Sequence, residues 1–322
     1  MTTTQDVAAY CLGKLGPGQI QNYLWYIQHS GLTIPILSFL HIGRPCIAGQ
    51  NYGDLIYNTY PDDLLFSNGV FNPQNRPEIA AWPKQVAQLK RNSSVKKIFL
   101  SIGGQGEDNI FDFRTIEYML NNRLGGVLEQ NFFMLRQLFV TDNGDYAIDG
   151  IDLDCEEDVD ASTIVSFSRM LFELGFEVTF SPYEYPDLWL DYMQQLWSEG
   201  HKVSWWNVQC FDGGKPNRDK IRMWNNTLAQ VVKKDAGSYL MPGLAAQGAV
   251  NGQCPTGAGS IEETFSRWRD LELGLRGGFL WNYDVINDNS NKPLCGATPV
   301  DLTEYVQAVT RGLTGTAQII GT

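Results

Sequence analysis

Three carboxylates occupy every second position in the stretch 147–158, which reads AIDGIDLDCEED. Side chains alternate between the two faces of a β-strand, so Asp152, Asp154 and Glu156 are predicted to share one face. Neighbours on one face lie roughly 6–7 Å apart, close enough in a partly enclosed site for charge repulsion to raise at least one pKa. A carboxyl group that stays protonated near neutral pH can act as a general acid.

Two alternatives for this stretch are a solvated acidic edge and a calcium-binding loop. A helix-loop-helix calcium site needs a glycine among its ligands and a glutamate about twelve places after the first ligand, and the sequence has neither. The apolar residues between the acids favour a buried strand, where placing acids is costly. Asp149 has the opposite parity to the other acids, and we expect it to hold the strand end through backbone hydrogen bonds.

The acidic strand must be held by neighbours, and the chain supplies a regular alternation of short apolar segments and helical patterns. This alternation predicts an α/β protein with a closed (β/α)8 TIM barrel rather than an open sheet. We expect one catalytic barrel domain over residues 1–312 and a frayed tail over 313–322. The expected strands are 6–13, 33–42, 96–102, the acidic stretch, 176–181, 203–211, 239–245 and 275–283, and the expected helices are 19–30, 77–91, 126–140, 162–174, 186–199, 218–234, 261–274 and 301–312.

One long connection interrupts the alternation. Residues 43–75 are rich in Asn, Asp, Gly, Pro and Tyr, and they read as an irregular loop. Such a loop is longer than most ordered connections, so a functional role is expected for it.

Active sites of TIM barrels lie at the carboxyl ends of the strands. The acids fall at the end of the fourth expected strand, and polar or aromatic residues end most of the others. These strand ends include Tyr10, Ser38, Phe39, Ser101, Pro182, Tyr183, Glu184, Gln209, Asp212, Trp281, Asn282, Tyr283 and Asp284.

Composition narrows the class of ligand. The formal net charge of −12 argues against nucleic acid or an anionic membrane as the main partner. The chain has nine Trp, 14 Tyr and 16 Phe, more rings than a core requires, so some are expected to line a cleft for a neutral ligand. No apolar run of 18 residues occurs, and the first residues lack the pattern of a signal peptide. We therefore expect a cytoplasmic or a trimmed protein, with its oligomeric state open.

The cysteines and histidines do not form a metal or nucleophile motif. The six cysteines lack CxxC or Cys/His spacing, and the three histidines lack the H-E-x-x-H pattern. No G-x-S-x-G motif or P-loop occurs, so neither metal nor cofactor is expected. Free thiols are expected within strands at Cys11, Cys155 and Cys210, whereas disulfide pairing stays open for Cys46, Cys254 and Cys295.

Two motifs together resemble the signatures of glycoside hydrolase family 18, the chitinases and endo-β-N-acetylglucosaminidases. They are SIGG at 101–104 and DGIDLDCE at 149–156, which matches the family's D-x-x-D-x-D-x-E at every acid. GGFLWNYD at 277–284 is similar to the family's last strand, and FSP at 180–182 and VQCFD at 208–212 match other strand ends more loosely.

The resemblance implies a retaining hydrolysis in which the substrate's own N-acetyl group replaces an enzymic nucleophile. It implies that Glu156 protonates the glycosidic oxygen and later activates water. It also implies that Asp154 orients the acetamido group and that Asp152 shares a proton with Asp154. Trp281 would stack on the sugar in the cleaved subsite, with a core position as the alternative.

The remaining site residues follow from the strand ends. Gln209 is assigned to the site because a buried amide needs a partner that an N-acetyl sugar can offer. For Tyr10 and for Phe39 two positions stay open, the wall of the site and the core. Asp212 ends the sixth strand and is assigned to the site. Gly103 and Gly104, after Ser101, permit a tight turn and a close backbone approach.

Phe211 departs from the family pattern, because many members carry a tyrosine there whose hydroxyl binds the acetamido oxygen. Loss of such a donor typically costs about 10²–10³ in rate if nothing replaces it. We hypothesise that Tyr183 or Tyr283 supplies the hydroxyl.

The leading hypothesis is a chitinase-like hydrolase of β-1,4-linked N-acetylglucosamine polymers or oligosaccharides. The alternatives are an endo-β-N-acetylglucosaminidase acting on N-glycans and a non-hydrolytic, lectin-like barrel that binds the same sugar. Inactive members usually lose the terminal glutamate, and Glu156 is present.

Overall fold

The computed structural model describes residues 5–45, 49–58, 63–104, 110–246, 256–291 and 300–316. Within them, eight parallel strands form a closed barrel, because β1 pairs with both β2 and β11. The predicted (β/α)8 TIM barrel is confirmed. Its strands are β1 (Asp6–Cys11), β2 (Ile34–Ile42), β6 (Phe99–Gly103), β7 (Gly150–Asp154), β8 (Glu177–Phe180), β9 (Trp206–Gln209), β10 (Leu240–Ala245) and β11 (Gly277–Trp281).

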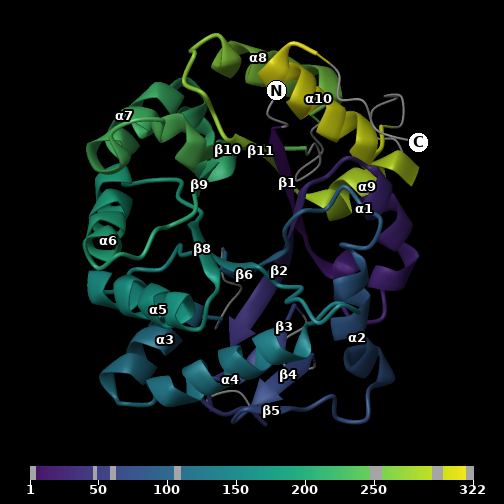
Figure 1. The fold of residues 1–322 in the computed structure, drawn as a ribbon, viewed down its shortest axis with the longest axis vertical. Helices are drawn as coiled ribbons and strands as arrows, with labels where there is room; N and C mark the ends of the chain where they lie inside the picture. Colours follow the sequence, from purple (N-terminus) through teal and green to yellow (C-terminus); the bar gives the residue numbers. More distant parts are fainter. Residues whose placement is uncertain are drawn as a thin grey trace.

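Helices surround the ring of strands on the outside (Figure 1). They are α1 (Leu24–His29), α2 (Pro77–Gln88), α3 (Asp112–Asn121), α4 (Gly125–Leu138), α5 (Ala161–Glu173), α6 (Pro186–Ser198), α7 (Ile221–Val232), α8 (Ala258–Arg269), α9 (Tyr283–Asn291) and α10 (Leu302–Thr314).

Three helical segments differ from expectation. The segment 19–30 is divided into a 3-10 turn, η2 (Ile20–Asn22), and the short helix α1. Helix α3 was not predicted, although Phe113, Ile116 and Met119 at helical spacing are all buried. Helix α9 was not predicted either, because its sequence YDVINDNSN is rich in residues with low helix propensity.

The prediction of an irregular loop over 43–75 is wrong for much of its described part. Three short strands, β3 (Leu55–Tyr57), β4 (Leu64–Ser67) and β5 (Val70–Phe71), form an antiparallel extension of β2. Strand β2 is nine residues long, and its last residues pair with β3. The three side chains of β3 are buried, so this extension is part of the packed structure.

The inside of the barrel changes from apolar to polar toward the carboxyl ends of the strands. The lower part is an apolar cluster that includes Ile34, Phe99, Trp205, Met241 and Phe279. Above it lies a layer of fully buried polar side chains, Ser101, Asp152, Thr179 and Asn207. The outward-facing residues of the strands pack against the helices in a separate and larger cluster. The apolar cluster therefore lies beneath a buried polar layer, which in turn lies under the mouth of the barrel.

The C-terminal helix α10 continues two residues beyond the expected boundary at Gly312 and is capped by Gly315 in a left-handed conformation (φ 76°). Residues 317–322 of the expected tail lie outside the described residues. Cys11, Cys155 and Cys210 carry free thiols, whereas Cys46, Cys254 and Cys295 also lie outside the described residues. No helix in the described part of the chain is both long and apolar enough to cross a bilayer.

Candidate active site

Asp152 is the centre of the polar layer and accepts four side-chain hydrogen bonds from four other strands or strand ends. Its Oδ2 accepts from the Tyr10 hydroxyl at 2.8 Å and from Ser101 Oγ at 2.8 Å. Its Oδ1 accepts from Thr179 Oγ1 at 2.7 Å and from Asn207 Nδ2 at 2.9 Å. Burial raises the pKa of Asp152, and these four donors oppose that rise by stabilising the charged form.

Asp154 lies one step nearer to the mouth on the same face of β7 and is 3% exposed. Gln209 donates from Nε2 to Asp154 Oδ1 at 2.9 Å and to the carbonyl oxygen of Ser181 at 3.1 Å. Burial, and then the charges of Glu156 and Asp152, raise the pKa of Asp154 well above its usual range. The charge of Asp152 therefore acts on its neighbour Asp154.

Glu156 lies beyond the strand, contrary to the alternation predicted for all three acids. Strand β7 ends at Asp154, which pairs with Gly103, the last residue of β6. Gly103 and Gly104 have φ values of 101° and 79°, so the extended backbone of β6 ends there, with the Gly104 N–H bonded to the carbonyl oxygen of Asp154 at 2.8 Å. Glu156 is exposed at the mouth, free to meet a ligand, while the two aspartates are fixed below it.

Although the residue as a whole is exposed, neighbouring atoms partly shield the carboxyl group of Glu156 from water. This desolvation, and then the negative charge of Asp212, raise the pKa of Glu156, while the Gln209 amide opposes the rise. This direction suits a general acid, because a raised pKa keeps the carboxyl group protonated closer to neutral pH.

A pocket of about 280 Å³ opens above these acids. Trp281 forms part of its wall and is stacked on Phe211, with ring centroids 5.8 Å apart and an interplanar angle of 17°. The residues that line this pocket are Gly104, Asp154, Glu156, Tyr183, Gln209, Phe211, Asp212, Gly213 and Trp281. The pocket thus brings together two of the predicted catalytic acids and most of the predicted binding residues.

Several predicted site residues lie beneath or beside the pocket. Tyr10 is 1% exposed and works from below as a donor to Asp152. Phe39 packs against two residues of the pocket wall, Trp281 and Gly104. The ring centroids of Phe39 and Trp281 are 6.1 Å apart, and a Cβ added to Gly104 would lie 2.6 Å from the Phe39 ring. Asp149 lies at the other end of β7, where its Oδ2 accepts the backbone N–H of Ile98 at 2.7 Å.

The two tyrosines considered as hydroxyl donors are separated by the fold. Tyr183 lines the pocket, and the charge of Glu156 contributes to raising its pKa after burial. Tyr283 begins α9, is 1% exposed and packs edge-on against Tyr23, away from the acids. Only Tyr183 is placed to meet a ligand in this pocket.

Sequence reasoning missed three buried polar residues: Thr179, Ser181 and Asn207. Thr179 and Asn207 bind Asp152, and Ser181 Oγ lies 2.9 Å from the Tyr10 hydroxyl. The alternation of side chains along the strands could have found them. Asn207 shares a face with Gln209, and Thr179 shares a face with Ser181, so all of these side chains were expected on the same side of their strands.

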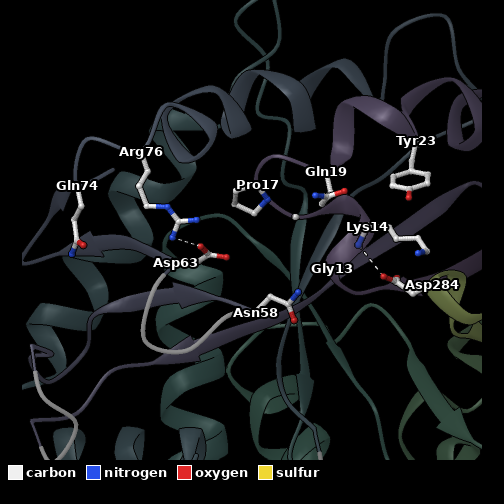
Figure 2. Close-up of a pocket in the computed structure, with 11 residues that line it drawn as sticks. Gly13, Lys14, Pro17, Gln19, Tyr23, Asn58, Asp63, Gln74, Arg76 and Asp284 are labelled. Atoms are coloured by element: carbon white, nitrogen blue, oxygen red, sulfur yellow. Dashed lines mark hydrogen bonds and ion pairs between the residues drawn. The ribbon is translucent and has the colours of Figure 1, made fainter.

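A larger pocket of about 700 Å³ lies beside the first strand and contains none of the three acids (Figure 2). Its wall includes Lys14, Arg76 and Asp63, with Arg76 Nη1 and Asp63 Oδ1 2.6 Å apart. Asp284 accepts the backbone N–H groups of Leu12 and Lys14, which joins the ends of β1 and β11. Across the described ranges, no group of three or more His, Cys, Asp or Glu side chains is arranged to hold a metal ion.

No protein-family model matches this sequence, and no curated protein sequence is a significant match. Solved structures do match. A family 18 chitinase from Pseudoalteromonas aurantia shares 12% identity with a TM-score of 0.60, covering 96% of this chain and 100% of the other. The chain shares its fold with family 18 chitinases.

Two further structures show the range of proteins built on this fold. A family 18 chitinase from Cycas revoluta, solved with (GlcNAc)4, has 12% identity and a TM-score of 0.50, covering 94% of this chain and 99% of the other. A xylanase and α-amylase inhibitor protein, solved with trehalose, has 16% identity and a TM-score of 0.53, covering 98% and 100%. Because the fold is shared by enzymes and an inhibitor, function has to be argued from the site.

Proposed function

We propose that this protein is a glycoside hydrolase that cleaves β-1,4-linked N-acetylglucosamine chains with retention of configuration. The observation that carries the proposal is the placement of Glu156, exposed and with a raised pKa, directly above the buried Asp154 in a pocket walled by Trp281. An acid at the mouth and a fixed carboxylate below it provide the two roles that substrate-assisted cleavage requires.

In the proposed reaction, Glu156 donates its proton to the glycosidic oxygen as the bond to the anomeric carbon breaks. The carbonyl oxygen of the substrate's acetamido group attacks that carbon from the opposite face and forms a cyclic, positively charged intermediate. Asp154 orients the acetamido group and stabilises the positive charge, and the charge of Asp152 adds to this field. Glu156 then accepts a proton from water as the water opens the intermediate.

A sugar-binding protein without catalysis is the second candidate, and Phe211 favours it. The ring of Phe211 is 6% exposed and stacks on Trp281, so a sugar would find the wall but no hydroxyl at this position. The inhibitor protein with the same fold supports this alternative as well. The enzyme is preferred because a sugar-binding site has no need of an exposed acid with a raised pKa.

The test is Glu156→Gln, compared with Glu173→Gln on the exposed surface of α5 as the matched control. We expect Glu156→Gln to lose at least about 10³-fold in release of product from chitin oligosaccharides, because general acid–base catalysis supplies up to about 10⁴-fold. The affinity of Glu156→Gln for the N-acetylglucosamine tetrasaccharide should stay near the wild-type value. Glu173→Gln should keep both the wild-type rate of product release and the wild-type affinity. An active Glu156→Gln protein refutes the mechanism. Tight binding without release by the wild type establishes the second candidate.

A further inference from the structure

A pocket of about 290 Å³ opens at the end of the barrel opposite to the three acids. It is lined by residues that begin or shortly precede β6, β8, β9, β10 and β11, so it lies at the amino ends of these strands. Active sites of TIM barrels lie at the other end, and the amino ends usually serve stability. The residues of this pocket are therefore not part of the candidate active site, and their chemistry needs a separate explanation.

Ion pairs link the strands around the amino end of the barrel, and they contain more cations than acids. Asp6, which begins β1, lies 3.0 Å from Arg276 (Oδ2 to Nη2) and 3.4 Å from Lys96 (Oδ1 to Nζ). Glu177, which begins β8, pairs with Lys97. Two carboxylates thus balance three cations in this group, and one positive charge is left over beside the pocket.

Lys202 adds a second unbalanced positive charge. Its side chain lines the pocket and forms no ion pair with an acid in the described part of the chain. Its Nζ lies 5.5 Å from the centre of the Trp197 ring, so its contact there is with an aromatic face rather than with a carboxylate. The chain as a whole carries a net charge of −12, so an excess of cations in one pocket would draw an anion to that point.

Trp205 and Arg276 form a wall of the pocket that is fixed before a ligand arrives. Trp205 is fully buried, and its Nε1 donates to Asn207 Oδ1 at 2.8 Å. The guanidinium group of Arg276 lies over the Trp205 ring, with Cζ 4.2 Å from the ring centre. Among the described atoms, Arg276 Nε is buried without a hydrogen-bond partner, so Asp6 does not satisfy all the donors of this guanidinium group.

Glu177 is the one acid among the described residues that line the pocket, and both of its carboxylate oxygens are already engaged. Its Oε1 pairs with Lys97, and its Oε2 accepts the Ser204 hydroxyl at 2.9 Å. The negative charge of Glu177 is therefore compensated. A bound anion would face the unbalanced charge of Lys202 and the partly balanced charge of Arg276.

We propose that this pocket binds a small molecule through an oxyanion, either a phosphate or a carboxylate group. Lys202 would donate from its ammonium group and Arg276 from its guanidinium group, because hydrogen bonds between such cations and oxyanions are strong. Tyr239, another lining residue, makes no hydrogen bond through its hydroxyl in the described ranges and would supply a neutral donor. The site lies at the far end of the barrel from Glu156, so it does not depend on the proposed function.

Isothermal titration calorimetry at constant ionic strength tests the site with two probes, inorganic phosphate and acetate, against chloride as the reference anion. We expect the wild type to bind one of the two oxyanions with a Kd of about 1 mM or lower. Lys202→Gln should bind the same oxyanion about tenfold more weakly, because it loses a hydrogen bond between two charged groups. Tighter binding of phosphate assigns a phosphate-bearing ligand, and tighter binding of acetate assigns a carboxylate-bearing one.

Matched variants separate this site from a general effect of charge. Lys215→Gln removes an exposed lysine of the 3-10 segment η3 (Asp212–Asp219), which follows the carboxyl end of β9, and should leave the affinity for the oxyanion unchanged. Lys202→Glu places a carboxylate among the cations of the pocket. It should abolish oxyanion binding and raise the free energy of unfolding measured without the oxyanion, whereas Lys215→Glu should do neither.

Two outcomes overturn the proposal. The first is a wild type that binds neither phosphate nor acetate at about 10 mM. The second is an equal affinity in the wild type and in Lys202→Gln, because the anion would then bind elsewhere. Either outcome leaves the proposed hydrolysis in place, since that reaction is tested by product release in Glu156→Gln.

Discussion

The four donors around Asp152 lead to a prediction for Thr179→Val. Thr179 is fully buried, and valine has nearly its shape, so the substitution chiefly removes one hydrogen bond to Asp152 Oδ1 and leaves that oxygen with Asn207. A hydrogen bond to a charged group contributes about 1.5–3 kcal/mol to stability. The charged carboxylate loses more from this change than the protonated carboxyl group does, so the pKa of Asp152 should rise further in the variant.

The stability lost in Thr179→Val should depend on pH if the lost hydrogen bond was made to a charged Asp152. Burial places the pKa of Asp152 in the folded protein above that in the unfolded chain. The carboxyl group therefore favours folding most below the unfolded pKa, and this contribution is lost as the pH rises through the folded pKa. At pH 8 the variant should lose about 1.5–3 kcal/mol, and at pH 4, where a protonated carboxyl accepts only a neutral hydrogen bond, about 1 kcal/mol.

Denaturant unfolding of wild type and variant at the two pH values measures both losses. Thr310→Val is the matched control, because Thr310 is also buried but donates to a helix carbonyl group, that of Val306. Its loss should be about 1 kcal/mol at either pH. A loss in Thr179→Val that is equal at pH 4 and pH 8 would show that Asp152 is not charged in the folded protein, and would refute the reasoning.

Two further predictions concern the chemistry of the pocket. Tyr183→Phe should lower kcat at least tenfold if its hydroxyl replaces the missing donor, whereas Tyr283→Phe, buried away from the pocket, should leave kcat unchanged. Steady-state kinetics on chitin oligosaccharides decide this, and equal kcat values in both variants contradict the replacement. Asp212→Asn removes a negative charge that raises the pKa of Glu156, so that pKa should fall and the alkaline limb of the kcat/KM profile should move to lower pH. An alkaline limb that stays in place or moves upward excludes Asp212 as a cause of the raised pKa.

The barrel and most of the site were predictable because they depend on local signals. Alternating parity placed Asp152 and Asp154 on one face, and the rule for strand ends placed Gln209 and Trp281 in the same mouth. The position of Glu156 was not predictable in the same way, since β7 ends at the register where the extended backbone of its neighbour β6 also ends. That is a property of another strand.

The partners of Asp152 were also beyond local reasoning. Thr179 and Asn207 are 27 and 55 residues away in sequence, and only closure of the barrel brings them to the carboxylate. Their hydroxyl and amide groups carry no local signal that separates a buried donor from an exposed one. The antiparallel strands after β2 were missed for a related reason, because β3 is only three residues long and depends on the edge of β2 for its conformation.

The carboxylate at the centre of the barrel has a consequence for how the chain finds its fold. Its four donors come from β1, β6, β9 and the third residue of β8, and each points inward only in the native register. A slip of one residue in any of these strands would turn its donor outward and leave the buried carboxyl group of Asp152 short of a partner, which is destabilising. The strand that carries Asp152 and Asp154 thus also discriminates against misaligned barrels, so one aspartate supports both correct assembly of the barrel and the architecture of the candidate site.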